Sequence, residues 1–191
     1  MKLKTRLNGK TFEFRDVKDV LAKANEPKSA DRFQGIAAET VTERIAAKVV
    51  LSNLTVSDIT ENPVVPYEKD EVTRVELDAL NQRVYGSFKN MTIGEVREWI
   101  MNSHTTKDDL YRGSFAFNGE TVAAIAKICS TSDLIYGASK ASNPTRCVTQ
   151  IGLPGTLSYR CQTNSTTDDV DSILFGVKEG VSFGSGDACI G

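Results

Sequence analysis

The C-terminal segment, residues 151–191, constrains the fold more than any other part of the chain. A strand-like run ends in Arg160-Cys161-Gln162, a polar turn follows, and an amphipathic helix-like run leads to a short apolar strand at the last residue. Strand, helix and strand in this order form the start of a βαβ unit with parallel strands. The pattern therefore predicts an α/β protein and is typical of the front part of a larger α/β enzyme.

Arg160 and Gln162 are the candidate site residues of this unit. They lie two apart on a strand, so both side chains should leave the same face. A parallel strand covered by helices is normally apolar throughout. In an α/β barrel, by contrast, polar residues near the carboxyl ends of strands bind ligands. The alternative is an edge strand whose polar side chains are solvated.

The composition and charge of the chain limit the classes of partner that it is expected to bind. The chain has 191 residues, of which 40% are hydrophobic and 25% charged, enough for one domain or for a small domain with a fragment. The net charge is −2 and no basic stripe occurs, so we predict no nucleic-acid partner. No run approaches the roughly 18 apolar residues of a membrane span, and no apolar signal core follows the basic N-terminus. We therefore expect a cytoplasmic protein without a membrane partner.

Residues 1–147 are predicted to form a mostly helical region that opens with a β-hairpin. Asn8-Gly9 stands between alternating runs at 2–7 and 11–15, which is a strong hairpin signal. Apolar residues then recur at three- and four-residue steps. The expected helices cover residues 17–24, 29–53, 55–59, 71–88, 120–130 and 132–140, with a further helix that begins at Thr92. The best candidate for a linker is 141–145.

The remaining chemically interesting side chains favour structural roles. Cys129, Cys147, Cys161 and Cys189 form no CxxC pair and have no metal-ligand spacing, so we interpret them as buried free thiols. His104 is the only histidine, which excludes a multi-histidine metal site, and we expect it in a solvated loop. The sequence thus predicts no catalytic, cofactor-binding or metal-ligating residue.

Glycines and acidic residues near the C-terminus are interpreted as turn and cap signals. Gly152-x-x-Gly155 does not have the spacing of a phosphate loop and is expected in a turn. The run 166–169, Thr-Thr-Asp-Asp, predicts hydroxyl caps with carboxylates near a helix N-terminus. Gly184-Ser185-Gly186 predicts the stop of that helix.

Several blocks, in this order, resemble the large subunit of ethanolamine ammonia-lyase, an adenosylcobalamin-dependent enzyme. The similarity runs along the whole chain, covers less than half of the family's subunit, and is looser over 62–118. Tyr159 and Cys161 depart from the smaller or apolar residues usual beside the family's site. The matching blocks are residues 1–5, 16–25, 123–130, 133–138, 151–156, 179–184 and 186–188.

The resemblance implies a fold: a helical N-terminal region, 1–147, followed by the incomplete start of a TIM (β/α)8 barrel, 148–191. On this reading Thr156–Gln162 is the first barrel strand, Asp168–Phe183 the first barrel helix and Ala188–Gly191 the beginning of the second strand.

The resemblance also implies a function. The family converts ethanolamine to acetaldehyde and ammonia by a radical mechanism, and its substrate-binding arginine and glutamine fall on Arg160 and Gln162. It implies adenosylcobalamin as cofactor, a small subunit as partner in a hetero-oligomer, and a cytoplasmic location or a bacterial microcompartment. We expect the chain alone to be inactive, because a barrel needs eight strands to close.

Two other functions stay open. A short chain of this kind could serve as a non-catalytic interaction or assembly module. A cobalamin carrier domain would require an Asp-x-His-x-x-Gly motif, and His104 has no such neighbours.

Overall fold

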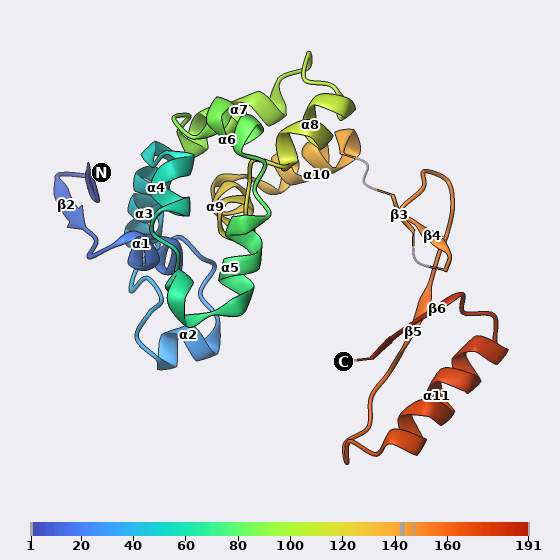
Figure 1. Cartoon of the computed structure of the whole chain (residues 1–191). Coiled ribbons are helices and arrows are strands. Elements are labelled where there is room, and N and C mark those ends of the chain that lie inside the picture. The colour runs from blue at the N-terminus through green and yellow to red at the C-terminus, as the bar shows by residue number, and fades with distance from the viewer. Residues whose placement is uncertain (1, 142–143, 147, 191) are drawn as a thin grey trace. The chain divides into compact units, whose positions relative to one another are not determined.

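A computed structural model describes residues 2–141, 144–146 and 148–190, with the backbone alone for Ile190. The chain divides into two compact units, Met1–Lys140 and Ala141–Gly191, which are described separately below (Figure 1). Helices and strands occur together, so the predicted α/β class is confirmed. The predicted boundary between residues 147 and 148 stays a prediction. No helix in the described part of the chain is long and apolar enough to cross a membrane.

The N-terminal unit opens with the predicted hairpin. Strands β1 (Lys4–Leu7) and β2 (Lys10–Glu13) are antiparallel. The connecting residues Asn8 and Gly9 have φ angles of 48° and 78°, as a two-residue turn that matches the twist of its strands requires. Asp16 then caps helix α1, where its carboxylate accepts the Asp19 amide at 2.7 Å.

The rest of this unit is helical, as predicted. Its elements are α1 (Val17–Lys23), α2 (Ser29–Phe33), α3 (Val41–Asn53), α4 (Val56–Thr60), the 3-10 helix η1 (Tyr67–Lys69), α5 (Glu71–Asp78), α6 (Gln82–Phe88), α7 (Ile93–Met101), α8 (Lys107–Ser114), α9 (Gly119–Ile128) and α10 (Thr131–Lys140). The predicted capping box at Thr92 and Glu95 is present at the start of α7.

Two of the predicted long helices are each broken in two. The expected helix 29–53 is interrupted after α2, where Gly35 has a φ of 68°, and Thr40 caps α3 afresh. Within the expected helix 71–88, α5 ends at Asp78 and a second helix, α6, begins at Gln82. The Asn81 side chain caps α6 by accepting the amides of Arg83 and Val84. Polar caps inside an apolar periodicity therefore ended helices that the periodicity alone would continue.

Helix α3 lies at the centre of the core and packs on β1, α1, α7 and α9. Its buried face carries Ala46, Ala47, Val50 and Leu51, whereas Val41, its first residue, is 64% exposed. The largest fully buried side chains of the unit are Val17, Val20, Val50, Leu51, Leu54, Val56, Ile59, Ile93 and Val96.

The C-terminal unit combines a small hairpin with a βαβ unit. Strands β3 (Thr145–Arg146) and β4 (Gln150–Ile151) pair antiparallel, which the sequence did not predict. Strand β5 (Arg160–Thr163), helix α11 (Val170–Ser182) and strand β6 (Asp187–Ile190) follow, and β5 and β6 are parallel. The predicted strand–helix–strand is therefore present, although β5 begins at Arg160 instead of Thr156, because only residues opposite β6 have a partner strand.

Candidate functional site

Strand β5 presents two polar side chains on one face. Burial alternates along it: Arg160 and Gln162 are exposed, whereas Cys161 and Thr163 are half-buried. Arg160 is the first of the four residues of the paired strand and Gln162 the third, so only Gln162 lies in its carboxyl-terminal half. The pleat of the strand puts the two side chains on a common face.

The opposite face of β5 lies against α11 through two glycines. A Cβ atom at Gly180 would lie 2.6 Å from the Cβ and Sγ atoms of Cys161, and one at Gly176 would lie 2.8 Å from Cγ2 of Thr163. Glycines four apart on one helix face allow this close approach. Cys161 therefore faces the helix, and Arg160 points to the other side. The four-residue spacing of Gly176 and Gly180 is the sequence signal for this close approach.

The pairing of β5 with β6 brings two further side chains to this face. Arg160 is opposite Asp187, and Gln162 is opposite Cys189. Residues opposite one another in a parallel pair point to the same side of the sheet. Asp187 and Cys189 therefore share the face of Arg160 and Gln162, which sequence reasoning missed because the two strands are separated by a helix.

The Asp187 carboxylate is held by a loop that precedes β4. Oδ1 accepts the Val148 amide at 2.9 Å, and Oδ2 accepts the Thr149 amide at 3.0 Å as well as the Thr149 hydroxyl. These hydrogen bonds, the one from the hydroxyl first, lower the pKa of Asp187. Among the ion pairs of the described residues, none includes Arg160.

The ends of α11 depend on short polar residues. Asp169 is the N-cap and accepts the Ser172 amide at 2.8 Å, while Ser165 Oγ accepts the Asp169 amide at 3.2 Å. Carboxylate capping is thus confirmed, but the hydroxyl involved is that of Ser165 instead of the predicted threonines. Gly184, with a φ of 93°, follows the helix as predicted.

The other candidates of the sequence are a histidine, the cysteines and two glycines. His104 lies in an exposed turn. Cys129, Cys161 and Cys189 are free and half-buried instead of buried, and Cys147 lies outside the described residues. Within the described ranges, no group of three or more His, Cys, Asp or Glu could hold a metal ion. Gly152 and Gly155 have φ angles of 88° and 73° in a turn, as predicted.

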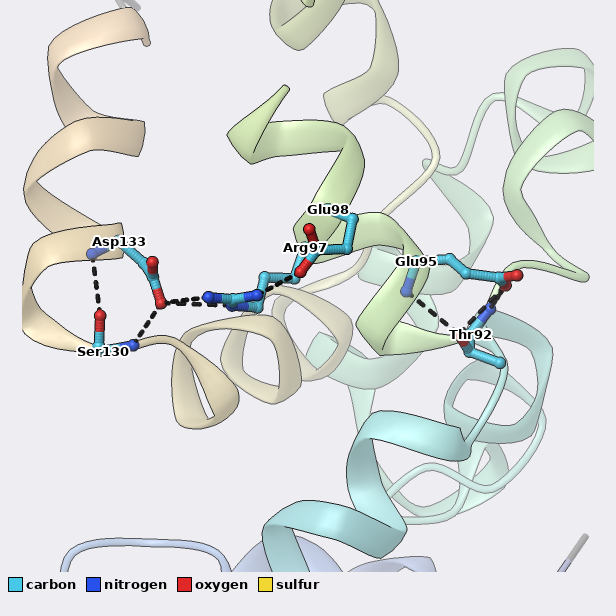
Figure 2. Close-up of polar contacts among 6 residues, drawn as sticks. All are labelled: Thr92, Glu95, Arg97, Glu98, Ser130 and Asp133. Atoms are coloured by element: carbon cyan, nitrogen blue, oxygen red, sulfur yellow. Dashed lines mark hydrogen bonds and ion pairs between the residues drawn. The ribbon is translucent and has the colours of Figure 1, made fainter. Parts of the chain in front are cut away.

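A second polar cluster lies in the N-terminal unit, between α7 and α10 (Figure 2). Arg97 donates from Nη2 to Oδ2 of Asp133 at 2.7 Å, and the same oxygen accepts the Ser130 amide at 2.7 Å. Arg97 also pairs with the more exposed Glu98. The arginine and the Ser130 bonds together lower the pKa of Asp133 to about 2. Every charge in this cluster has a partner, so it joins two helices and leaves no group directed at a ligand.

The fold and the polar strand together define an α/β protein with a candidate ligand-binding face. A family model described as "Ethanolamine ammonia lyase large subunit (EutB)" matches residues 12–191. The chain belongs to the ethanolamine ammonia-lyase large-subunit family.

Individual relatives agree with this assignment. The ethanolamine ammonia-lyase large subunits of Escherichia coli (strain K12) and Salmonella typhimurium (strain LT2) are each 51% identical to this chain over 191 residues. These alignments cover 100% of this chain and 42% of each relative, so the chain spans about two fifths of their length.

Proposed function

We propose that this chain forms the N-terminal part of the large subunit of an ethanolamine ammonia-lyase, and that Arg160 and Gln162 bind its substrate. The observation that carries the proposal is the exposed face that these two side chains share on β5, opposite the face that contacts α11. The family supports the reaction, which converts ethanolamine to acetaldehyde and ammonia.

The two side chains suit the two ends of ethanolamine. Arg160 is a permanent cation that only donates hydrogen bonds, so it should contact the hydroxyl oxygen and lie away from the substrate ammonium. The amide oxygen of Gln162 can accept from that ammonium. Two residues on a strand are separated by roughly 7 Å along its axis, which leaves room for a two-carbon substrate between the two groups. The pair would therefore set the direction in which the substrate lies.

The rest of the enzyme follows from the family. We infer a TIM barrel in which β5 is the first strand, α11 the first helix and β6 the second strand. The complete enzyme would pair with a small subunit in a hetero-oligomer, in the cytoplasm or a bacterial microcompartment. Adenosylcobalamin, when bound, supplies the radical chemistry. The described residues show no set of metal ligands, so we assign none of them to the cofactor.

A chimaera tests the role of Arg160. This chain would replace the aligned N-terminal 42% of the Escherichia coli large subunit, which is 51% identical, and be assembled with that enzyme's other components and its cofactor. Arg160→Ala removes a hydrogen bond to a polar substrate group, worth about 1.5–3 kcal/mol, so kcat/KM for ethanolamine should fall roughly 10- to 100-fold. Arg160→Lys should restore part of it, because an ammonium does not reproduce the guanidinium fork.

Variants of Gln162 test the contact with the ammonium end of the substrate. Gln162→Ala should chiefly raise KM, whereas Gln162→Glu should be milder because a carboxylate still accepts from the ammonium. Thermal melts should change little in all four variants, since both side chains are exposed. A near-normal kcat/KM in Arg160→Ala would remove this residue from the substrate site.

A further inference from the structure

Arg160 and Asp187 are opposite charges on one face of a parallel pair, yet they do not form an ion pair. They lie opposite each other in the register of β5 and β6, and neighbouring strands are separated by roughly 5 Å. A long arginine side chain can span that distance. The carboxylate instead accepts three hydrogen bonds from Val148 and Thr149, and these compete with the guanidinium for its lone pairs.

Thr149 binds the Asp187 carboxylate through both its backbone amide and its side-chain hydroxyl. Its amide and its hydroxyl both donate to Oδ2, so the hydroxyl occupies a lone pair that would otherwise be open to Arg160. The methyl group of Thr149 lies against the backbone of Gly186, the residue that precedes Asp187. A Cβ atom at Gly186 would come within 1.9 Å of Thr149 Cγ2. The absence of a side chain at Gly186 therefore lets Thr149 approach the start of β6.

We propose that Thr149 is a positioning residue of the substrate site: by engaging the Asp187 carboxylate it keeps Arg160 from pairing with it, so that the guanidinium stays available to the substrate hydroxyl. This inference rests on the proposed function for the identity of the ligand. The competition between Thr149 and Arg160 for Asp187 is a property of the chain itself and can be measured without turnover.

Three variants separate this role from simple support of the fold. Thr149→Val removes the hydroxyl and keeps the shape, so Oδ2 of Asp187, which accepts both hydrogen bonds from Thr149, gains a free lone pair. Thr149→Ser keeps the hydroxyl and removes the methyl group that packs on Gly186, and is the matched control. The double variant Thr149→Val with Asp187→Asn removes both the hydroxyl and the competing charge.

The first measurement uses this chain alone. Phenylglyoxal modifies free guanidinium groups, and peptide mapping by mass spectrometry gives the rate at Arg160. In Thr149→Val we expect a rate about two- to fivefold lower than in the unsubstituted chain, the factor that corresponds to an exposed ion pair. Thr149→Ser should react like the unsubstituted chain, and the double variant should recover the normal rate. Loss of support for the fold would instead increase the rate, and the double variant would not reverse it.

The second measurement uses the chimaeric holoenzyme. Thr149→Val should raise KM for ethanolamine about two- to fivefold with kcat within about twofold, and the double variant should restore KM. Equal behaviour of Thr149→Val and Thr149→Ser in both assays would overturn the inference while Arg160→Ala could still support the proposed function. Normal turnover in Arg160→Ala together with the expected modification rates would instead refute the proposed function and leave the competition for Asp187 standing.

Discussion

Glu120, on α9, carries a half-buried carboxyl group with only one of its oxygens satisfied. Oε1 accepts the Val64 amide at 2.8 Å, whereas Oε2 is buried without a hydrogen-bond partner among the described residues. Burial raises the pKa of Glu120, the bond from Val64 opposes the shift, and Glu76 adds to it. Asp187 shows the opposite case, since donors from Val148 and Thr149 favour its charged form. The number of hydrogen-bond donors near each carboxyl group thus decides whether its protonated or its charged form is favoured.

Glu120→Gln should therefore change how stability depends on pH. A raised folded-state pKa gives stability that is fully present below the ordinary pKa of a glutamate and is lost as pH rises through the folded-state value. The variant keeps the acceptor for Val64 and removes the charge. We expect a higher melting temperature than in the unsubstituted protein near pH 7, and a difference that shrinks toward about pH 4. Glu61→Gln, at an exposed position, is the control, and parallel pH profiles for Glu120→Gln and the unsubstituted protein would contradict this expectation.

Single polar contacts also attach whole helices. Asp133 lies at the third position of α10, where it completes that helix's N-terminal hydrogen bonds with Ser130 and receives Arg97 from α7 (Figure 2). One carboxylate thus both starts a helix and fixes it to its neighbour. Glu98, in contrast, has a side chain that is 71% exposed.

Asp133→Asn should loosen α10 and lower the melting temperature at neutral pH. The folded-state pKa of about 2 is depressed, so this stability is present above the ordinary pKa of an aspartate and is lost as pH falls through about 2. The difference between variant and unsubstituted protein should therefore vanish toward that pH. Glu98→Gln, which removes the exposed partner of Arg97, should have a small effect. Equal melting temperatures for the two variants at pH 7 would show that the bridge does not stabilise α10.

The two units of the chain differ in how far their apolar side chains are buried. The N-terminal unit surrounds α3 with buried side chains. In the C-terminal unit, most large apolar side chains of α11 stay exposed, among them Val170 and Phe175 at 67% and 68%. A helix with such a face is suited to further packing partners.

At this scale we expect the chain alone not to turn over ethanolamine. Its described residues supply two candidate substrate ligands and one parallel pair of strands, whereas the proposed site lies within a closed barrel. The measurement is acetaldehyde and ammonia release by the purified chain with added adenosylcobalamin, next to the chimaeric holoenzyme as positive control. Cofactor-dependent product from the chain alone would show that β5 and β6 suffice for the reaction.

Local signals in the sequence were enough for much of the fold. Asn8-Gly9 predicted the hairpin, Asp16 and Thr92 predicted helix starts, and Gly184 predicted a helix stop, because each acts through hydrogen bonds or dihedral angles within a few residues. Apolar periodicity was less reliable: it did not show the break at Asn81, where a polar cap interrupts an otherwise continuous pattern.

The sequence by itself determined the strand–helix–strand order and the common face of Arg160 and Gln162, since the alternation of a strand follows from its backbone. Only the tertiary structure decided which side of β5 meets α11, where the paired strand begins, and that Asp187 lies opposite Arg160. The loop contact from Thr149 to Asp187 spans 38 residues of sequence. Contacts of that range depend on how the elements pack, and no local pattern encodes them.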